Sequence, residues 1–313
     1  MQEQLNKMTQ EWLQIKKTAI KYSTYCKYET LISHYLDPFF SKHAIETLNE
    51  VQIIDYLNGL IQVDHLSTST IHSIKSVLKS VYYYGMQQYK LKPLNFDLIQ
   101  FNHHPQKKKT LTEIEEGTLY QYCLNHQNKL AFAIMLGLYG GLRLGEICGL
   151  KWQDIDLERG LLFVNKTVQR LKDKQDSSKT KLYILDPKTF SSAREVILPD
   201  FLVTYFKFYY EFYEIDESKE TLFLLSLKNR PVDPRTIQRQ FTNLCSKKAI
   251  TATFHTLRHT YATNCIKKGI DVKTVSETLG HANITVTLNR YVHPSFDYKK
   301  EQINKIKAPE GLK

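Results

Sequence analysis

Apolar residues recur every three or four positions through the first part of the chain. The recurrence runs from Glu11 to about Tyr89, and this spacing places hydrophobic side chains on one face of an α-helix. The hydroxyl-rich cluster Ser67-Thr68-Ser69-Thr70 precedes one of these stretches. Such residues are preferred at helix starts because they accept hydrogen bonds from unpaired backbone N–H groups. The pattern predicts an all-α domain over residues 1–101.

The composition changes between residues 102 and 111, where a proline and three consecutive lysines interrupt the helical pattern. A new helix start follows in the sequence LTEIEE, Leu111 to Glu116. We therefore expect a basic linker over residues 102–111, a second domain over 112–294 and a C-terminal tail over 295–313.

The second domain combines two kinds of pattern. The apolar run Leu130 to Tyr139 is interpreted as a helix, and beyond Asp156 the period shortens toward that of β-strands. Three short segments have the composition of strands: Leu161 to Val164, Lys181 to Leu185 and Arg194 to Leu198. The fold class expected for the whole chain is mainly α with a small antiparallel β-sheet.

The sequence Asp186-Pro187-Lys188-Thr189 separates the last two of these strands and is rich in turn-forming residues. It predicts a hairpin with Lys188 at its tip. A lysine at such a tip is usually just exposed to solvent, although a tip can also deliver an ammonium group into a neighbouring cleft.

Two helices are expected toward the C-terminus. The aromatic-rich segment Thr204 to Glu214 is interpreted as a core helix. Asp233 precedes a second helix that runs to about Lys248, and this helix carries Arg235 and Arg239 four positions apart, where both could reach DNA.

The chain is strongly basic, with a formal net charge of +11 and a pI of about 9.2. Basic proteins favour polyanions, nucleic acid first and anionic membrane second. No apolar run approaches the roughly 18 residues of a membrane span, and the start MQEQLNKMTQEW lacks the apolar core of a signal peptide. We expect a cytoplasmic, nucleoid-associated protein that does not bind membranes.

Neither a metal nor a cofactor is expected. The 5 cysteines are scattered and never form a CxxC pair, so they are interpreted as small buried residues. His255 and His259 are four apart, a spacing that also occurs in zinc sites. A zinc protease helix, however, needs glutamate directly after the first histidine, and Thr256 stands there.

Several basic and hydroxyl residues are candidate contacts to DNA phosphates. A helix that begins after Ser67 would offer its N-terminus and one basic face, and a basic linker could lie along the DNA backbone. An ordinary capped helix and a solvated charge run are the structural alternatives. The candidates are Ser69, Thr70, Lys75, Lys79, Lys107, Lys108, Lys109, Arg235 and Arg239.

Two short segments bring together groups that could act on a phosphate. In HTLRH, His255 and Arg258 are three apart and project from the same helix face. In GGLRLGE, Arg143 and Glu146 are also three apart, so Glu146 can orient the guanidinium by a charge-assisted hydrogen bond. The glycine-rich segment is neither GxGxxG nor a Walker loop, and nucleotide binding is not supported.

A tyrosine near the C-terminus is a candidate nucleophile. Tyr291 stands ten positions after His281 in the sequence LGHANITVTLNRYVH. A phenol with an ordinary pKa near 10 is a weak nucleophile at neutral pH, so Tyr291 requires neighbours that assist it.

Taken together, these segments resemble the tyrosine recombinases, also called phage integrases. The resemblance covers about Thr110 to His293 and rests on four segments in the family's order: GLRLGE, PKTFSSAREVILP, FHTLRHTYAT and LGHANITVTLNRYVH. The N-terminal helices resemble the family's core-binding domain more loosely. The resemblance implies an all-α core-binding domain and an α+β catalytic domain that form a C-shaped clamp around double-stranded DNA.

The resemblance also implies transesterification without metal or ATP. Arg143 and Arg258 would hold the non-bridging oxygens of the scissile phosphate, and Tyr291 would attack phosphorus to form a 3′-phosphotyrosine. Proton transfer and further phosphate binding would fall to Lys188, His255 and His281.

The family further implies a homotetramer on two DNA sites, aided by an accessory directionality factor, with the tail from Tyr298 to Ile306 packed into a neighbouring subunit. We favour integration and excision of a mobile element. The alternatives are a chromosome-dimer-resolving recombinase, a DNA invertase and a type IB topoisomerase. A regulator that binds DNA without chemistry is the alternative from another class, but Arg143, Arg258 and Tyr291 are all present.

Overall fold

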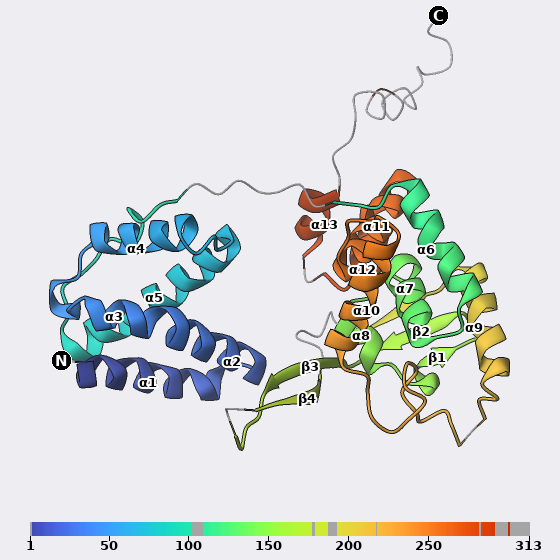
Figure 1. Cartoon of the computed structure of the whole chain (residues 1–313), viewed down its shortest axis with the longest axis horizontal. Coiled ribbons are helices and arrows are strands. Elements are labelled where there is room, and N and C mark those ends of the chain that lie inside the picture. The colour runs from blue at the N-terminus through green and yellow to red at the C-terminus, as the bar shows by residue number, and fades with distance from the viewer. Residues whose placement is uncertain are drawn as a thin grey trace, which may run out of the picture. The chain divides into compact units, whose positions relative to one another are not determined.

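The computed structural model describes residues 2–101, 109–176, 179–186, 193–216, 218–281, 283–291 and 300, with the backbone alone for residues 2–6 and 289–291. The chain divides into two compact units, Met1–Lys107 and Lys108–Lys313, called unit 1 and unit 2. Figure 1 labels their helices and strands. In the described part of the chain, no helix is both long enough and apolar enough to cross a bilayer.

The regular secondary structure described in unit 1 is all helical up to Tyr89, as the apolar spacing predicts. Its segments are α1 (Gln2–Ala19), α2 (Tyr22–Leu31), the π-helix η1 (Ile32–Leu36), α3 (Asp37–Lys42), the 3-10 helix η2 (Ile45–Thr47), α4 (Glu50–Gln62) and α5 (Thr68–Tyr89). Their apolar faces meet in one core, in which Trp12, Ile53 and Leu78 are buried. Burial of this face supplies the hydrophobic free energy that holds the short helices together.

Helix starts are held by local side chains. The Ser67 hydroxyl accepts a hydrogen bond from the backbone N–H of Thr70, and α5 begins directly after it. In unit 2, the Thr112 hydroxyl accepts from the N–H of Glu115, whose carboxylate accepts from the N–H of Thr112 in return. Both helix starts predicted from the sequence are confirmed, because such caps satisfy N–H groups that lack a helical partner.

Unit 2 is built around α7, which is buried along nearly its whole length. Figure 1 shows α7 in the interior, and it contacts α6, α8, α10 and α11. The helical segments of unit 2 are α6 (Glu113–Asn125), α7 (Lys129–Tyr139), α8 (Leu144–Gly149), the 3-10 helix η3 (Trp152–Asp154), α9 (Asp200–Phe212), α10 (Pro234–Lys247), α11 (Phe254–Lys267), α12 (Val272–Leu279) and α13 (Ile284–Tyr291).

In the described residues of unit 2, the strands form two small antiparallel sheets. One has the order β1 (Ile155–Asp156), β2 (Leu161–Val164) and β5 (Arg194–Ile197). The other pairs β3 (Thr167–Lys172) with β4 (Thr180–Leu185). The expected mainly α fold with a small amount of antiparallel sheet is confirmed.

The predicted hairpin around Lys188 is wrong in its strand pairing. The strands on either side of that segment, β4 and β5, lie in different sheets, because β4 pairs with β3 and β5 pairs with β2. Strand β3 was not predicted, because its residues are mostly half-buried and show no apolar run. Lys188 itself lies outside the described residues.

The aromatic helix α9 contributes only one of its faces to the core. Tyr205, Phe206 and Tyr209 are buried, whereas Phe208 and Phe212 are 52% and 57% exposed. The expectation of a core helix is therefore correct for one face only.

All 5 cysteines are buried and free, as expected. Within the described ranges, no group of three or more His, Cys, Asp or Glu side chains is arranged to hold a metal ion.

Candidate active site

Three guanidinium groups meet at the C-terminal end of α12. Arg194 Nε donates to the carbonyl oxygen of residue 278 at 2.6 Å, Arg258 Nη2 to that of residue 279 at 2.6 Å, and Arg143 Nη2 to that of residue 280 at 3.5 Å. The last carbonyl groups of a helix lack intrahelical partners and carry partial negative charge, so cations are stabilised there. We call these three residues the arginine cluster.

The members of the arginine cluster come from three separate elements. Arg143 precedes α8 as its N-cap residue, Arg194 is the first residue of β5, and Arg258 lies in α11. The end of α12 therefore joins parts of unit 2 that are distant in sequence. Gly280 allows this close approach, because it ends α12 with a φ of 62° and a Cβ there would meet the Arg194 side chain at 3.0 Å.

Glu146 links two members of the arginine cluster. Its Oε1 accepts from Arg143 Nη1 at 2.8 Å and from Arg194 Nη1 at 3.2 Å, and its Oε2 accepts from Arg194 Nη2 at 3.0 Å. Burial by itself would raise the pKa of Glu146, but the charges and hydrogen bonds of Arg194 and Arg143 lower it to about 2. The predicted pairing of Glu146 with Arg143 is confirmed, and Glu146 is ionised at neutral pH.

Arg258 is almost completely enclosed. The residue is 2% exposed, and its Nη1 donates to the carbonyl of Gly141 at 2.7 Å. Gly141 has a φ of 67°, and a Cβ at this position would meet the Tyr261 ring at 2.5 Å. The Arg143 side chain is 39% exposed, so it offers more guanidinium surface to an incoming phosphate than Arg258 does.

The three histidines singled out by the sequence differ in exposure. His255 is exposed at the start of α11, whereas His259 one turn later is buried, and their ring centroids lie 4.4 Å apart. His281 is half-buried, and its Nδ1 is hydrogen-bonded to Thr287 Oγ1 at 2.8 Å. Thr287 is fully buried and lies in α13, so this bond joins His281 to the helix that ends at Tyr291.

Two of the predicted catalytic residues, Tyr291 and Lys188, are not fully described by the structure. Tyr291 is the last residue of α13, of which the backbone is described, and α13 contacts α11 and α12. Lys188 lies outside the described residues. The structure thus brings together Arg143, Arg258 and His281 with the helix of Tyr291.

The candidate DNA contacts of unit 1 are not all equally accessible. Ser69 is exposed at the start of α5, while the Thr70 hydroxyl is hydrogen-bonded to that of Ser67. Lys75 is half-buried and donates to the carbonyl of Ile99. Lys79 lies 3.7 Å from an Asp97 carboxylate oxygen.

Among the candidates of unit 2, Arg235 and Arg239 are exposed on α10. Lys109 is also exposed, and its ammonium nitrogen lies 3.6 Å from a Glu115 oxygen. Lys107 and Lys108 lie outside the described residues.

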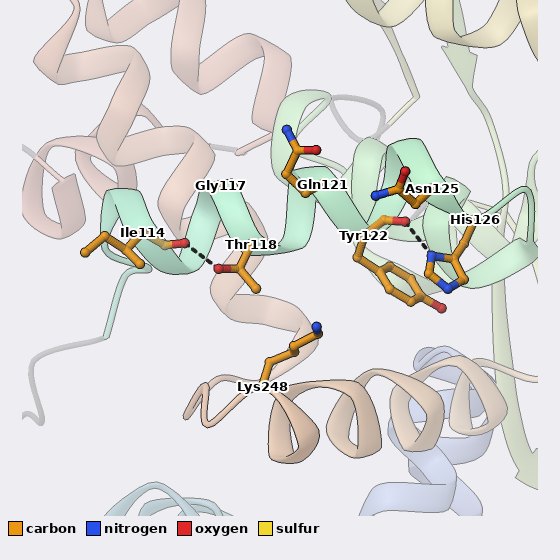
Figure 2. A pocket seen from close by; sticks show the side chains of 8 residues that line it. All are labelled: Ile114, Gly117, Thr118, Gln121, Tyr122, Asn125, His126 and Lys248. Carbon is orange, nitrogen blue, oxygen red and sulfur yellow. Dashed lines mark hydrogen bonds between the residues drawn. The ribbon is translucent and has the colours of Figure 1, made fainter.

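A shallow hollow of about 500 Å³ lies apart from the arginine cluster. Figure 2 shows that α6 and the residue after it supply most of its lining, with Lys248 on the opposite side. None of the predicted catalytic or DNA-binding residues lines it.

Two residues of the site, Arg194 and Thr287, were not predicted from the sequence. Arg194 had a readable signal, because alternation along the strand puts it on the same face as Val196 and Leu198, both of which are buried. A charge on a buried face needs a partner, and the partner here is Glu146. Thr287 had no such signal, since its contact with His281 depends on the angle between two helices.

Comparison with known proteins identifies two matching families. Residues 109–297 match the Phage integrase family, and residues 4–61 match the Phage integrase N-terminal SAM-like domain. The chain is 29% identical over 312 residues to a tyrosine recombinase XerC-like protein of Caldanaerobacter subterraneus subsp. tengcongensis, covering 92% of this chain and 79% of that protein. It is 31% identical over 264 residues to the transposase from transposon Tn916 of Enterococcus faecalis, covering 78% of this chain and 64% of that protein.

Two solved structures share the fold. The Tn1549 transposon integrase in complex with transposon right end DNA has a TM-score of 0.76 at 22% identity, covering 96% of this chain and 99% of that one. A lambda integrase tetramer bound to a Holliday junction has a TM-score of 0.66 at 20% identity, covering 92% of this chain and 77% of that one.

Proposed function

Because the chain belongs to the phage integrase family of tyrosine recombinases, we propose that it cleaves and rejoins duplex DNA at specific sites through a 3′-phosphotyrosine intermediate. Enzymes of this family are DNA strand transferases. The observation that carries the proposal is the arginine cluster at the end of α12, directly before His281 and in contact with the helix that ends at Tyr291.

The arginines supply the electrostatic part of the reaction. Negative charge on the phosphate oxygens must be stabilised as phosphorus becomes five-coordinate, and oriented guanidinium groups do this when their positions are fixed beforehand. Arg143 and Arg258 are fixed by bonds to backbone carbonyls and, for Arg143, to Glu146. Arg143 is the more accessible of the two, because its side chain is 39% exposed whereas Arg258 is 2% exposed.

The covalent steps exchange one phosphodiester for another. The Tyr291 phenol oxygen attacks phosphorus while the bond to the 5′ oxygen breaks, and His255 accepts the phenol proton. Lys188 protonates the leaving 5′ oxygen, and His281 donates a hydrogen bond to the phosphate. Attack of a 5′-hydroxyl from another strand on the phosphotyrosine reverses these steps and rejoins the DNA. No ATP is consumed, since the number of phosphoester bonds is conserved.

The preferred biological role is integration and excision of a mobile element, carried out by a homotetramer on two DNA sites in the cytoplasm, at the nucleoid. Support comes from the likeness to the transposase from transposon Tn916, although this chain spans 64% of that protein's length. The lambda integrase of similar fold is a tetramer on a Holliday junction. We retain residues 1–101 as the core-binding domain, 102–111 as the linker and 112–294 as the catalytic domain, with an accessory directionality factor as an additional partner.

The test uses nicked duplex half-sites taken from the DNA that flanks the chain's own gene. Cleavage of such a half-site releases the short fragment that carries the 5′-hydroxyl, so rejoining is prevented and the covalent protein–DNA adduct accumulates. The adduct is quantified on a denaturing gel. The native chain is expected to form the adduct and Tyr291→Phe to form none. An adduct that persists in Tyr291→Phe means that another residue is the nucleophile. Binding to the half-sites with no adduct favours a DNA-binding regulator.

A further inference from the structure

Arg194 is the member of the arginine cluster for which the proposed reaction has no role. Its side chain is 6% exposed, and within the site it donates to both oxygens of Glu146 and to the carbonyl of Thr278. It also lies against Gly280, the residue directly before His281. Both of its terminal nitrogens donate to the Glu146 carboxylate, so its charge is paired within the protein.

These bonds link Arg194 to two parts of the site. Through Glu146 it acts on Arg143, because the same carboxylate accepts from both guanidinium groups. Through Thr278 it holds the last turn of α12, after which the chain reaches His281. Loss of Arg194 would leave a buried carboxylate with one cationic partner and remove a donor from the helix end, and both changes are costly in a low-dielectric interior.

We infer that Arg194 is a positioning residue for strand transfer, which fixes the Glu146 carboxylate and the end of α12 and, through them, orients Arg143 and His281 toward the phosphate. The inference rests on the proposed function. A residue that acts only on the geometry of other side chains changes the cleavage rate far more than the affinity for DNA. Replacement of Arg194 should therefore affect cleavage and binding differently.

The first experiment measures single-turnover cleavage and non-covalent binding of the nicked half-sites by the full chain. Arg194→Met keeps the length of the side chain and removes its charge and donors. We expect cleavage to fall about 10- to 100-fold, the loss typical of buried charge-assisted hydrogen bonds, with binding changed less than about threefold. Arg194→Lys should restore part of the rate, because one ammonium group can reach Glu146 or the carbonyl but not span both.

A matched control lies on the same strand. Glu195 is exposed and follows Arg194 in β5, so Glu195→Gln changes a charge at this strand without touching the arginine cluster. It should cleave at the native rate.

A pH profile distinguishes positioning from simple loss of stability. Among the described residues, the charged groups that face Glu146 are Arg143 at the start of α8 and Arg194 in β5. In Arg194→Met, Arg143 is the one guanidinium of this pair left to oppose the effect of burial, so the pKa of Glu146 rises. The cleavage rate of Arg194→Met relative to the native chain should therefore be lowest near pH 5 and rise toward pH 8. Adding Glu146→Gln should abolish that rise.

A measurement without DNA keeps the inference separate from the proposed function. Backbone amides 278–281 should exchange hydrogen faster in Arg194→Met than in the native chain, and at the native rate in Glu195→Gln. If the native chain forms no adduct but these amides respond as expected, the proposed function fails while the structural role of Arg194 stands.

Three results would overturn the inference. The first is native cleavage by Arg194→Met, and the second is a loss of DNA binding as large as the loss of cleavage, which would make Arg194 a direct DNA contact. The third is a constant ratio of variant to native cleavage rate between pH 5 and pH 8.

If Arg194→Met does not fold, Arg194→Lys is measured in its place. Cleavage and amide exchange at the native rates in Arg194→Lys would then overturn the inference.

Discussion

Glu146 accepts hydrogen bonds from two members of the arginine cluster, so its ionisation affects both. Its pKa of about 2 lies below the ordinary value of 4.5, and the folded chain therefore binds this proton less tightly than the unfolded chain. Ionised Glu146 stabilises the fold above about pH 4.5, and this contribution is lost as the pH falls toward 2.

We predict that Glu146→Gln lowers the free energy of unfolding by about 3 kcal/mol at pH 7, the energy that corresponds to the pKa difference. The gap to the native chain should narrow as the pH falls below about 4.5, because Glu146 then takes up a proton in the unfolded native chain while it stays ionised in the folded one, which favours unfolding. Urea unfolding at pH 7 and at pH 3.5 measures the gap. Glu277→Gln is the control, since its side chain is 69% exposed and pairs with exposed Lys273. A gap that does not change with pH would contradict the prediction.

Gly141 has a backbone conformation and surroundings that only glycine tolerates. Its φ is 67°, and a Cβ would lie 2.5 Å from the Tyr261 ring. We predict that Gly141→Ala destabilises the chain by about 2–4 kcal/mol, from left-handed strain and overpacking together. Because Arg258 donates to the Gly141 carbonyl, the variant should also lose cleavage activity.

Gly117 provides the opposite case for comparison. It lies inside α6, on the helix face shown in Figure 2, and a Cβ there would meet nothing within 4 Å. Gly117→Ala should therefore raise the stability by about 0.5–1 kcal/mol through helix propensity. Thermal melting measures the change in stability of Gly141→Ala and of Gly117→Ala. Equal changes in the two variants would show that the space around the glycine does not determine the effect.

At the scale of elements, the corner between α12 and α13 determines how His281 is held. The ring of His281 is hydrogen-bonded to the hydroxyl of buried Thr287, and α13 continues from there to Tyr291. The hydrogen bond to the hydroxyl fixes the orientation of the imidazole ring.

We predict that Thr287→Val lowers single-turnover cleavage about 3- to 10-fold, because one hydrogen bond is lost while the buried volume is kept. Thr287→Ser keeps the hydroxyl and should cleave within about twofold of the native rate. Cleavage of the nicked half-sites measures both variants. The prediction fails if Thr287→Val cleaves as fast as Thr287→Ser, because the hydroxyl would then have no role in cleavage.

Helices and strands differed in how well their limits could be predicted. The starts of α5 and α6 followed from Ser67 and Thr112, because an N-cap acts on N–H groups two or three residues away. Strand pairing did not follow from the sequence. A strand of four to six residues can pair with several others of similar composition, and the choice of partner for β4 and β5 depends on packing against distant segments.

For the whole molecule, the net charge of +11 predicts a strong dependence of DNA binding on salt. Arg235 and Arg239 are exposed on α10, whereas Lys75 is half-buried and donates to a backbone carbonyl. The logarithm of the DNA affinity falls linearly with the logarithm of the salt concentration. We predict that replacing both arginines by Gln makes this slope shallower by about 1–2. Lys75→Met should leave that slope unchanged and reduce the stability of unit 1. Binding of a fluorescent duplex at several salt concentrations measures the slopes, and the reverse pattern would assign the DNA contact to Lys75.

The sequence by itself determined the features that depend on neighbours along the chain. These are the helical character of unit 1, the helix starts, the burial of the cysteines and the pairing of Arg143 with Glu146, three residues away. The motifs that indicated the family belong here too, since four short segments in a fixed order carry it. Such features are governed by local geometry and by hydrophobic periodicity, both of which can be read from adjacent residues.

Only the tertiary structure decided how distant residues meet. Arg194 reaches Glu146 and Thr278, and Arg258 reaches Gly141 and is enclosed, because α8, β5 and α11 converge on the end of α12. The physical reason is that helix-end carbonyls and a buried carboxylate must find partners once the core excludes water. No rule of spacing along the chain specifies which arginines supply those partners, since packing of the whole unit sets the distances.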